Sequence, residues 1–141
     1  MKKGMLFTLA VIVAAVFSSC SDDYLGDLTV PETETMSSGT WKVTYYFDNG
    51  DGVSNDLDPY TFDMQDDGNL VITGNGQSFT GSWFIKSSDD DPAYDKEIEF
   101  IISGNKDMDD IDGSWLIAKL TETEMELLDD TPSEELHLAR N

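Results

Sequence analysis

Cysteine and histidine are almost absent from this chain of 141 residues, which holds one of each. Cys20 lies in the N-terminal segment, so a domain beyond it has no thiol for a disulfide, a thiolate metal site or a nucleophile. One histidine, His137, excludes the usual zinc ligand sets and provides no nucleophile–base–orienter set for acyl transfer. The alternation of apolar and polar residues around His137 places its side chain on the solvent side of a strand. We therefore predict no enzymatic activity and no cofactor.

Basic residues are also scarce: 8 Lys and Arg stand against 29 Asp and Glu, a formal net charge of −21. Nucleic acids and anionic lipid headgroups need Lys or Arg to neutralise phosphate, so neither is expected as a partner. The simplest role for such a charge is solubility and repulsion between like-charged neighbours.

Long apolar runs are missing as well. The run from Met5 to Phe17 is too short for a membrane-spanning helix, which needs about 20 residues. It follows Lys2 and Lys3 and ends at two serines, which is the pattern of a secretory signal. The alternative at this point is an ordinary signal peptide with an incidental cysteine after it.

Cys20 directly follows that run, and Ser21, Asp22 and Asp23 come next. The arrangement resembles a bacterial lipoprotein signal, in which residues 1–19 are removed and the cysteine carries lipid. The acidic residues after it resemble the export signal of surface lipoproteins in Bacteroidetes. The resemblance implies an outer-membrane protein anchored at the cell surface; an anchor facing the periplasm is the alternative.

Residues 20–38 contain few large apolar side chains and no periodicity, so we predict a flexible acidic tether after the lipidated cysteine. The alternative is that residues 24–30 dock on the domain as an extra edge strand. The folded domain is expected to span residues 39–141.

From Gly39 onward apolar residues alternate with polar ones, the period of a β-strand. Glycine, Asp, Asn and Ser separate the runs, which predicts an all-β fold of eight antiparallel strands in up-and-down order. Closing the sheet into a small barrel, with the first strand paired to the last, would remove its exposed edges. A β-sandwich is the alternative. The runs are 41–47, 60–64, 70–72, 79–85, 98–102, 115–117, 125–127 and 136–138.

A Gly-x-Trp triplet recurs where strands begin, at 39–41, 81–83 and 113–115. The triplet at 39–41, with segments 60–83, 115–129 and 135–140, resembles the small lipocalin-like domains of Bacteroidetes lipoproteins. The resemblance implies an eight-stranded barrel, often without an assigned ligand.

Inward aromatic residues would either fill this barrel or line a ligand cavity. A filled core favours a non-enzymatic surface module that binds a protein or glycan; a void favours a carrier of a small apolar ligand. Some apolar residues alternate with the inward set and would therefore face outward. They would mark a contact site or lie under the tether or the 86–96 loop. They are Val71, Phe84, Ile101, Leu116 and Leu128. The inward candidates are Trp41, Tyr45, Tyr60, Phe62, Trp83, Phe100 and Trp115.

Acidic loops provide weak calcium candidates, although none has EF-hand spacing and no dedicated metal site is predicted. Solvated turns are the alternative. We expect the loops 48–58 and 86–96 to lie together at the barrel end away from Gly39. The candidate ligands are Asp48, Asp51, Asp89, Asp90 and Asp91.

Overall fold

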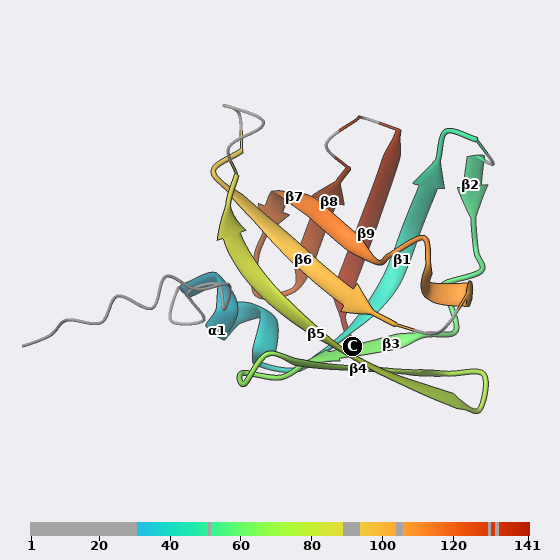
Figure 1. Ribbon diagram of the computed structural model, residues 1–141, viewed down its shortest axis with the longest axis horizontal. Coiled ribbons are helices and arrows are strands. Elements are labelled where there is room, and N and C mark those ends of the chain that lie inside the picture. The colour runs from blue at the N-terminus through green and yellow to red at the C-terminus, as the bar shows by residue number, and fades with distance from the viewer. Residues whose placement is uncertain (1–30, 51, 89–93, 104–105, 130, 132) are drawn as a thin grey trace, which may run out of the picture.

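The computed structural model describes residues 31–50, 52–88, 94–103, 106–129, 131 and 133–141 (Figure 1). These ranges hold one α-helix, nine β-strands and one 3-10 helix. In chain order they are α1 (Pro31–Ser37), β1 (Thr40–Asp48), β2 (Gly52–Ser54), β3 (Thr61–Met64), β4 (Asn69–Gly74), β5 (Gln77–Ser87), β6 (Lys96–Ile102), η1 (Lys106–Met108), β7 (Gly113–Leu120), β8 (Glu124–Leu128) and β9 (Glu134–Arg140).

The strands form a closed antiparallel barrel. From β3 to β9 each strand pairs with the next, and β1 pairs with both β3 and β9. The closing pair runs from Trp41 opposite Arg140 to Asp48 opposite Glu134. The expected eight-stranded barrel is therefore confirmed, and its ring of pairings leaves no separate sheets for a sandwich. Strand β2 is an addition that pairs with the end of β1.

Antiparallel order decides which connections share a barrel end. Helix α1, the start of β1 and the β3–β4, β5–β6 and β7–β8 connections share one end, called here the α1 end (Figure 1). The expectation that the 86–96 loop lies beside 48–58 is wrong, because β5 returns the chain to the α1 end. There Lys96 Nζ lies 2.7 Å from Glu32 Oε1 of α1. Residues 51 and 89–93 lie outside the described ranges.

The barrel interior is one continuous cluster of buried side chains, drawn from α1, from every strand except β2, from η1 and from the connecting segments. Large residues dominate this cluster, and its packing removes the inward faces of all eight barrel strands from water. The largest completely buried side chains include Trp41, Trp83, Phe62 and Phe100.

A β-bulge changes the alternation in β1. The β1–β9 register shifts between Val43 and Tyr45, so one extra residue separates the two halves of the strand. Tyr46 is consequently the buried residue, with 3% of its surface exposed, while Tyr45 and Phe47 are only half-buried. The expectation that Tyr45 faces inward is corrected by this bulge, which simple alternation does not reveal.

Helix α1 occupies the last part of the expected tether. Pro31 stands at the first helical position, where its missing N–H costs nothing, and two acidic residues in the first turn suit the helix dipole. Thr33 and Met36, three residues apart, are the buried residues of the helix. This corrects the expectation of a flexible tether up to residue 38; residues 20–30 lie outside the described ranges.

The three Gly-x-Trp triplets seal the two barrel ends. Each indole N–H donates a hydrogen bond to a main-chain carbonyl of a connecting segment. Trp41 bonds to the oxygen of Met36 in α1 at 2.7 Å, and Trp83 bonds to Gln65 in the β3–β4 turn at 2.9 Å. Trp115 bonds to Ile111 before β7 at 2.9 Å. The bulky rings are buried and their one polar group is satisfied.

Candidate functional site

The inward aromatic candidates belong to the packed interior. Tyr45 is the exception, on the outer wall. The others pack into the single core cluster, so their side chains contact neighbouring core residues. These six are Trp41, Tyr60, Phe62, Trp83, Phe100 and Trp115.

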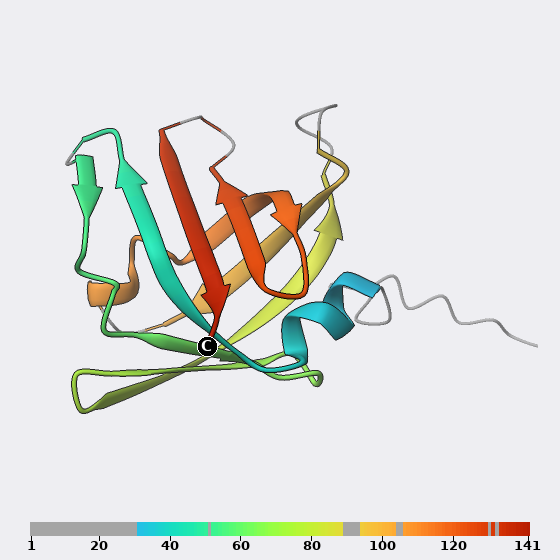
Figure 2. The same cartoon turned by 180° about the vertical axis from the view of Figure 1, so that it is seen from behind.

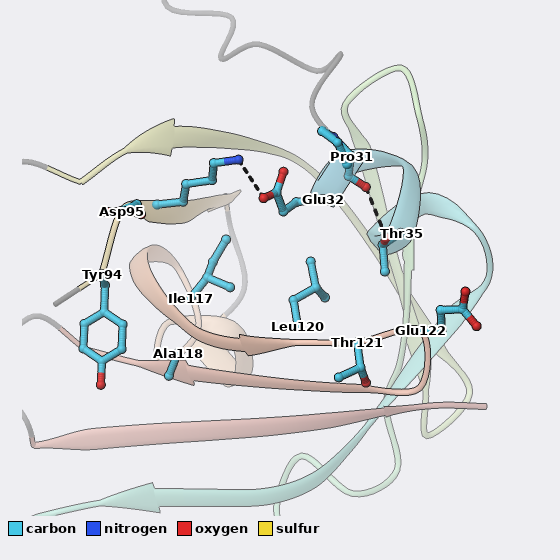
Figure 3. Close-up of a pocket in the computed structure, with 11 residues that line it drawn as sticks. Pro31, Glu32, Thr35, Tyr94, Asp95, Ile117, Ala118, Leu120, Thr121 and Glu122 are labelled. Carbon is cyan, nitrogen blue, oxygen red and sulfur yellow. Dashed lines mark hydrogen bonds and ion pairs between the residues drawn. The ribbon is translucent and has the colours of Figure 1, made fainter.

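An open hollow of about 610 Å³ lies beside α1 and is called here the α1 groove (Figure 3). Three segments distant in sequence form its walls: α1, the chain entering β6, and the end of β7 with the turn that follows. Figure 2 shows α1 beside this β7–β8 turn. The lining residues are Pro31, Glu32, Thr35, Tyr94, Asp95, Lys96, Ile117, Ala118, Leu120, Thr121 and Glu122.

The floor of the groove is apolar. Ile117 and Leu120 are partly buried and pack against the core, with Ala118 between them in sequence. The β7–β8 register shifts between Ile117 and Lys119, so an extra residue lies there. The shift puts Leu120 opposite the buried Met125, and Leu120 thereby covers the core at the mouth of the barrel.

Three of the groove's donor groups make hydrogen bonds or ion pairs within the protein, while the Tyr94 hydroxyl has no such bond among the described residues. The Lys96 ammonium pairs with Glu32, and this hydrogen bond is the main reason that the pKa of Glu32 falls below its usual value. The Thr35 hydroxyl donates to the oxygen of Pro31 at 3.1 Å. The Thr121 hydroxyl donates to the carbonyl of Glu124 at 3.2 Å.

Acceptors remain in the groove. Asp95 and Glu122 are exposed. Glu32 Oε2 is buried without a hydrogen-bond partner among the described residues. The groove therefore has more capacity to accept hydrogen bonds than to donate them.

A second hollow of about 610 Å³ adjoins the first at α1 and is called here the Arg140 hollow. It shares Pro31, Thr35 and Glu122 with the α1 groove. Arg140 forms part of its wall: Nη2 donates to the carbonyl of Thr35 at 2.8 Å, and Nε donates to the carbonyl of Glu122. The guanidinium carbon lies 4.5 Å from the centre of the Trp41 ring.

Of the calcium candidates, the structure describes Asp48 alone. Asp48 lies away from α1, where its Oδ1 accepts a hydrogen bond from the amide of Gly50 at 2.7 Å. Asp51, Asp89, Asp90 and Asp91 lie outside the described residues. Within the described ranges, no group of three or more His, Cys, Asp and Glu side chains is arranged to hold a metal ion.

Asp48 instead belongs to an acidic region around a hollow of about 430 Å³ at the end opposite α1. Burial, and then the charges of Asp129, Asp48 and Asp110, raise the pKa of Glu134 above its usual value. The hollow is lined by Asp109, Asp110, Asp112, Gly113, Ser114, Trp115, Asp129 and Glu134.

His137 lies on the outer wall of the barrel. Its Nε2 is 2.6 Å from Glu135 Oε1, and its ring centre is 5.0 Å from that of Tyr45. It lines none of the three hollows described above.

The outward apolar residues do not form an open apolar face. Ile101 is 47% exposed, but Leu116 is 3% exposed, and the remaining three are half-buried. A charged group lies among them: Lys86 Nζ is 3.3 Å from Glu97 and 2.8 Å from Glu99. Burial raises the pKa of Glu99, but hydrogen bonds from Lys86 and Ser114 outweigh it and lower the pKa.

Sequence reasoning missed the groove because it missed α1 and placed the 86–96 loop at the wrong end. Tyr94, Lys96, Ile117, Leu120 and Glu122 were consequently not singled out. Two signals could have found the site. A proline followed by acidic residues is typical of a helix start, and following the reversal of direction from each antiparallel strand to the next gives the barrel end at which each loop lies.

The fold and these hollows define a small closed β-barrel with one end partly covered by a short helix. In the described part of the chain, no helix has the length and apolar character needed to cross a membrane. No protein-family model and no curated protein matches the sequence.

The fold is similar to the crystal structure of a DUF4847 family protein from Bacteroides vulgatus, with a TM-score of 0.55. The alignment covers 77% of this chain and 96% of that one at 11% sequence identity. At this identity the similarity concerns the fold alone.

Proposed function

We propose that the protein is a lipid-anchored, non-enzymatic binding module of the outer membrane, displayed at the cell surface, and that the α1 groove is its binding site. The proposal for the anchor rests on the N-terminal signal pattern, on Cys20 and on the acidic residues after it. Two acyl chains or more on that cysteine would give stable attachment, since one chain binds a membrane only marginally.

The observation that carries the binding function is the position of the open space. The inward aromatic residues form one packed cluster, whereas the α1 groove opens at the barrel mouth with an apolar floor and a polar rim. Its volume falls within the usual range of ligand sites, about 300–1,000 Å³. A packed interior favours a surface module over a carrier whose ligand lies inside the barrel.

The absence of catalysis is part of the proposal. The sole histidine of the chain is engaged with Glu135 and Tyr45 on the outer wall, and the groove offers carboxylates, hydroxyls and one paired lysine. A protein or glycan partner fits an open groove of this kind, and the acidic surface disfavours nucleic acid.

The anchor is tested by metabolic labelling with a palmitate analogue. Wild-type protein should incorporate the label and fractionate with the outer membrane, and Cys20→Ala should do neither. Undiminished labelling of the variant would refute lipidation at Cys20. Digestion of intact cells with an added protease separates surface display, in which the protein is degraded, from a periplasmic orientation, in which it survives.

The site is tested with a photo-crosslinking amino acid placed in the membrane-anchored protein on intact cells. Thr123 lines the Arg140 hollow beside the groove, and Gln77 begins β5 directly after the β4–β5 turn at the opposite end; both are exposed. A discrete adduct at Thr123, identified by mass spectrometry and absent at Gln77, is expected. Adducts of equal yield at both positions, or at neither, would contradict the proposed site.

A further inference from the structure

The polar groups around α1 that have no partner within the described part of the protein indicate what kind of ligand fits. Of the groups lining the α1 groove, the Lys96 ammonium and the Thr35 and Thr121 hydroxyls already donate their hydrogen bonds within the protein. Two exposed carboxylates, Asp95 and Glu122, remain available to accept. Donors also remain in the Tyr94 hydroxyl and in the further N–H groups of Lys96, but the free carboxylate oxygens carry the charge, and a cationic donor satisfies carboxylates best.

The carboxylates form a series that continues around the helix. Asp95 lies on the α1 groove, Glu122 lines both hollows and Glu34 lines the Arg140 hollow. The one positive group of the second hollow, Arg140, donates to two carbonyls and lies over the Trp41 ring, and its Nη1 is buried without a partner among the described residues. An extended ligand with several positive charges would meet an acidic residue in each hollow and at the boundary between them.

The groove floor adds an apolar requirement. Ile117 and Leu120 cover the core at the groove, and an apolar group of the ligand would remove them from water. A small hydrated cation would leave this surface exposed.

From this combination we infer that the two hollows beside α1 bind a basic peptide segment, with lysine or arginine side chains on Asp95, Glu122 and Glu34 and an apolar side chain on Ile117 and Leu120. This inference rests on the proposed function and names the partner of the same site. The high negative charge of the chain would speed the encounter with such a segment.

The test uses full-length protein in a non-ionic detergent and three fluorescein-labelled pentapeptides, measured by fluorescence anisotropy at physiological salt. A Lys-Leu-Lys-Leu-Lys peptide carries both features, Lys-Ser-Lys-Ser-Lys only the charge, and Gln-Leu-Gln-Leu-Gln only the apolar groups. The first should bind about tenfold more tightly than either control, because each control loses one set of contacts.

Two double variants with the same change in charge then locate the site. Asp95→Asn with Glu122→Gln should weaken binding of the first peptide about fivefold to tenfold. Asp58→Asn with Asp109→Asn should change it less than about twofold, since both residues are exposed and line neither hollow beside α1.

Three outcomes overturn the inference: no binding of the first peptide, equal binding of the serine peptide, or equal losses in the two double variants. Each leaves the proposed function standing if crosslinking at Thr123 captures a partner without basic segments. Loss of site-specific crosslinking would instead remove the binding site itself.

Discussion

Replacement of Arg140 by alanine should destabilise the protein more than its position at the end of the chain suggests. The side chain joins three segments: it donates to the carbonyl of Thr35 in α1, donates to the carbonyl of Glu122 in the β7–β8 turn, and lies over the ring of Trp41. Alanine removes all three contacts, and α1 would then be held by its buried Thr33 and Met36, by the Trp41 hydrogen bond and by the Glu32–Lys96 ion pair.

The magnitude follows from these contacts. Hydrogen bonds from a charged donor contribute about 1.5–3 kcal/mol each, and a cation–π contact contributes about 1 kcal/mol. Arg140 is only half-buried, and water can reach the two carbonyls from the adjacent hollow once the side chain is gone, so the lower values apply. We expect a loss of about 3 kcal/mol in the free energy of unfolding, or about 10 °C in melting temperature.

Urea denaturation measures the loss, and two further variants identify its cause. Arg140→Lys keeps the charge but cannot donate to the carbonyls of Thr35 and Glu122 from two nitrogens, so it should recover about half of the lost stability. Lys119→Ala removes a cation whose pairs with Glu124 and Glu126 are exposed, and its melting temperature should match that of the wild type. A loss below about 1 kcal/mol for Arg140→Ala would refute the assigned role.

Hydrogen exchange gives a local readout of the same substitution. If Arg140 holds α1 on the barrel, the amides of α1 should exchange faster in Arg140→Ala, while the β5–β6 amides keep their protection. Uniform acceleration throughout the barrel would mean that the substitution lowers global stability without releasing the helix.

Two further predictions concern packing and pH. Gly81→Ala should cost about 1–3 kcal/mol of stability, because an added Cβ would overlap the carbonyl oxygen of Ile101, whereas Gly50→Ala places its Cβ 3.4 Å from the nearest atom and should be tolerated. Urea denaturation of both compares them. The raised pKa of Glu134 means that the folded state loses stability as pH rises from 4.5 through that pKa. Glu134→Gln should therefore melt higher than wild type at pH 7 but not below pH 4, and thermal scans check this.

The barrel was predictable because alternation and turn residues are local signals. The number of barrel strands followed from them, and the closing pair between the first and last strands followed from the need to remove exposed sheet edges. The bulge at Thr44 was not predictable in this way, since an extra residue leaves no mark in the pattern Val43, Tyr45, Phe47. A one-residue shift moves every later side chain to the other face, which is why Tyr46 and not Tyr45 is buried.

The site was less accessible to sequence reasoning, because it depends on contacts between distant segments. The Glu32–Lys96 pair joins residues 64 positions apart in the sequence, and Arg140 bonds to Thr35 across 105 positions. The Gly-x-Trp repeat was visible in the sequence, but the structural reason for each glycine was not. Gly39 and Gly113 have positive φ values of 155° and 131°, whereas Gly81 is needed for its close approach to Ile101.

The last prediction concerns the orientation of the site relative to the membrane. Eleven peptide steps separate Cys20 from Pro31, so the start of α1 can lie no more than about 40 Å from the proposed lipid anchor. A domain of this size is roughly 30 Å across, so the opposite end can lie considerably farther away. In vesicles with an acceptor dye on the lipid headgroups, a donor at Thr123 should transfer energy more efficiently than a donor at Gln77. Cys20→Ala, added to the same vesicles, should abolish transfer from both positions. Equal transfer from the two donors in the anchored protein would contradict a groove held close to the membrane.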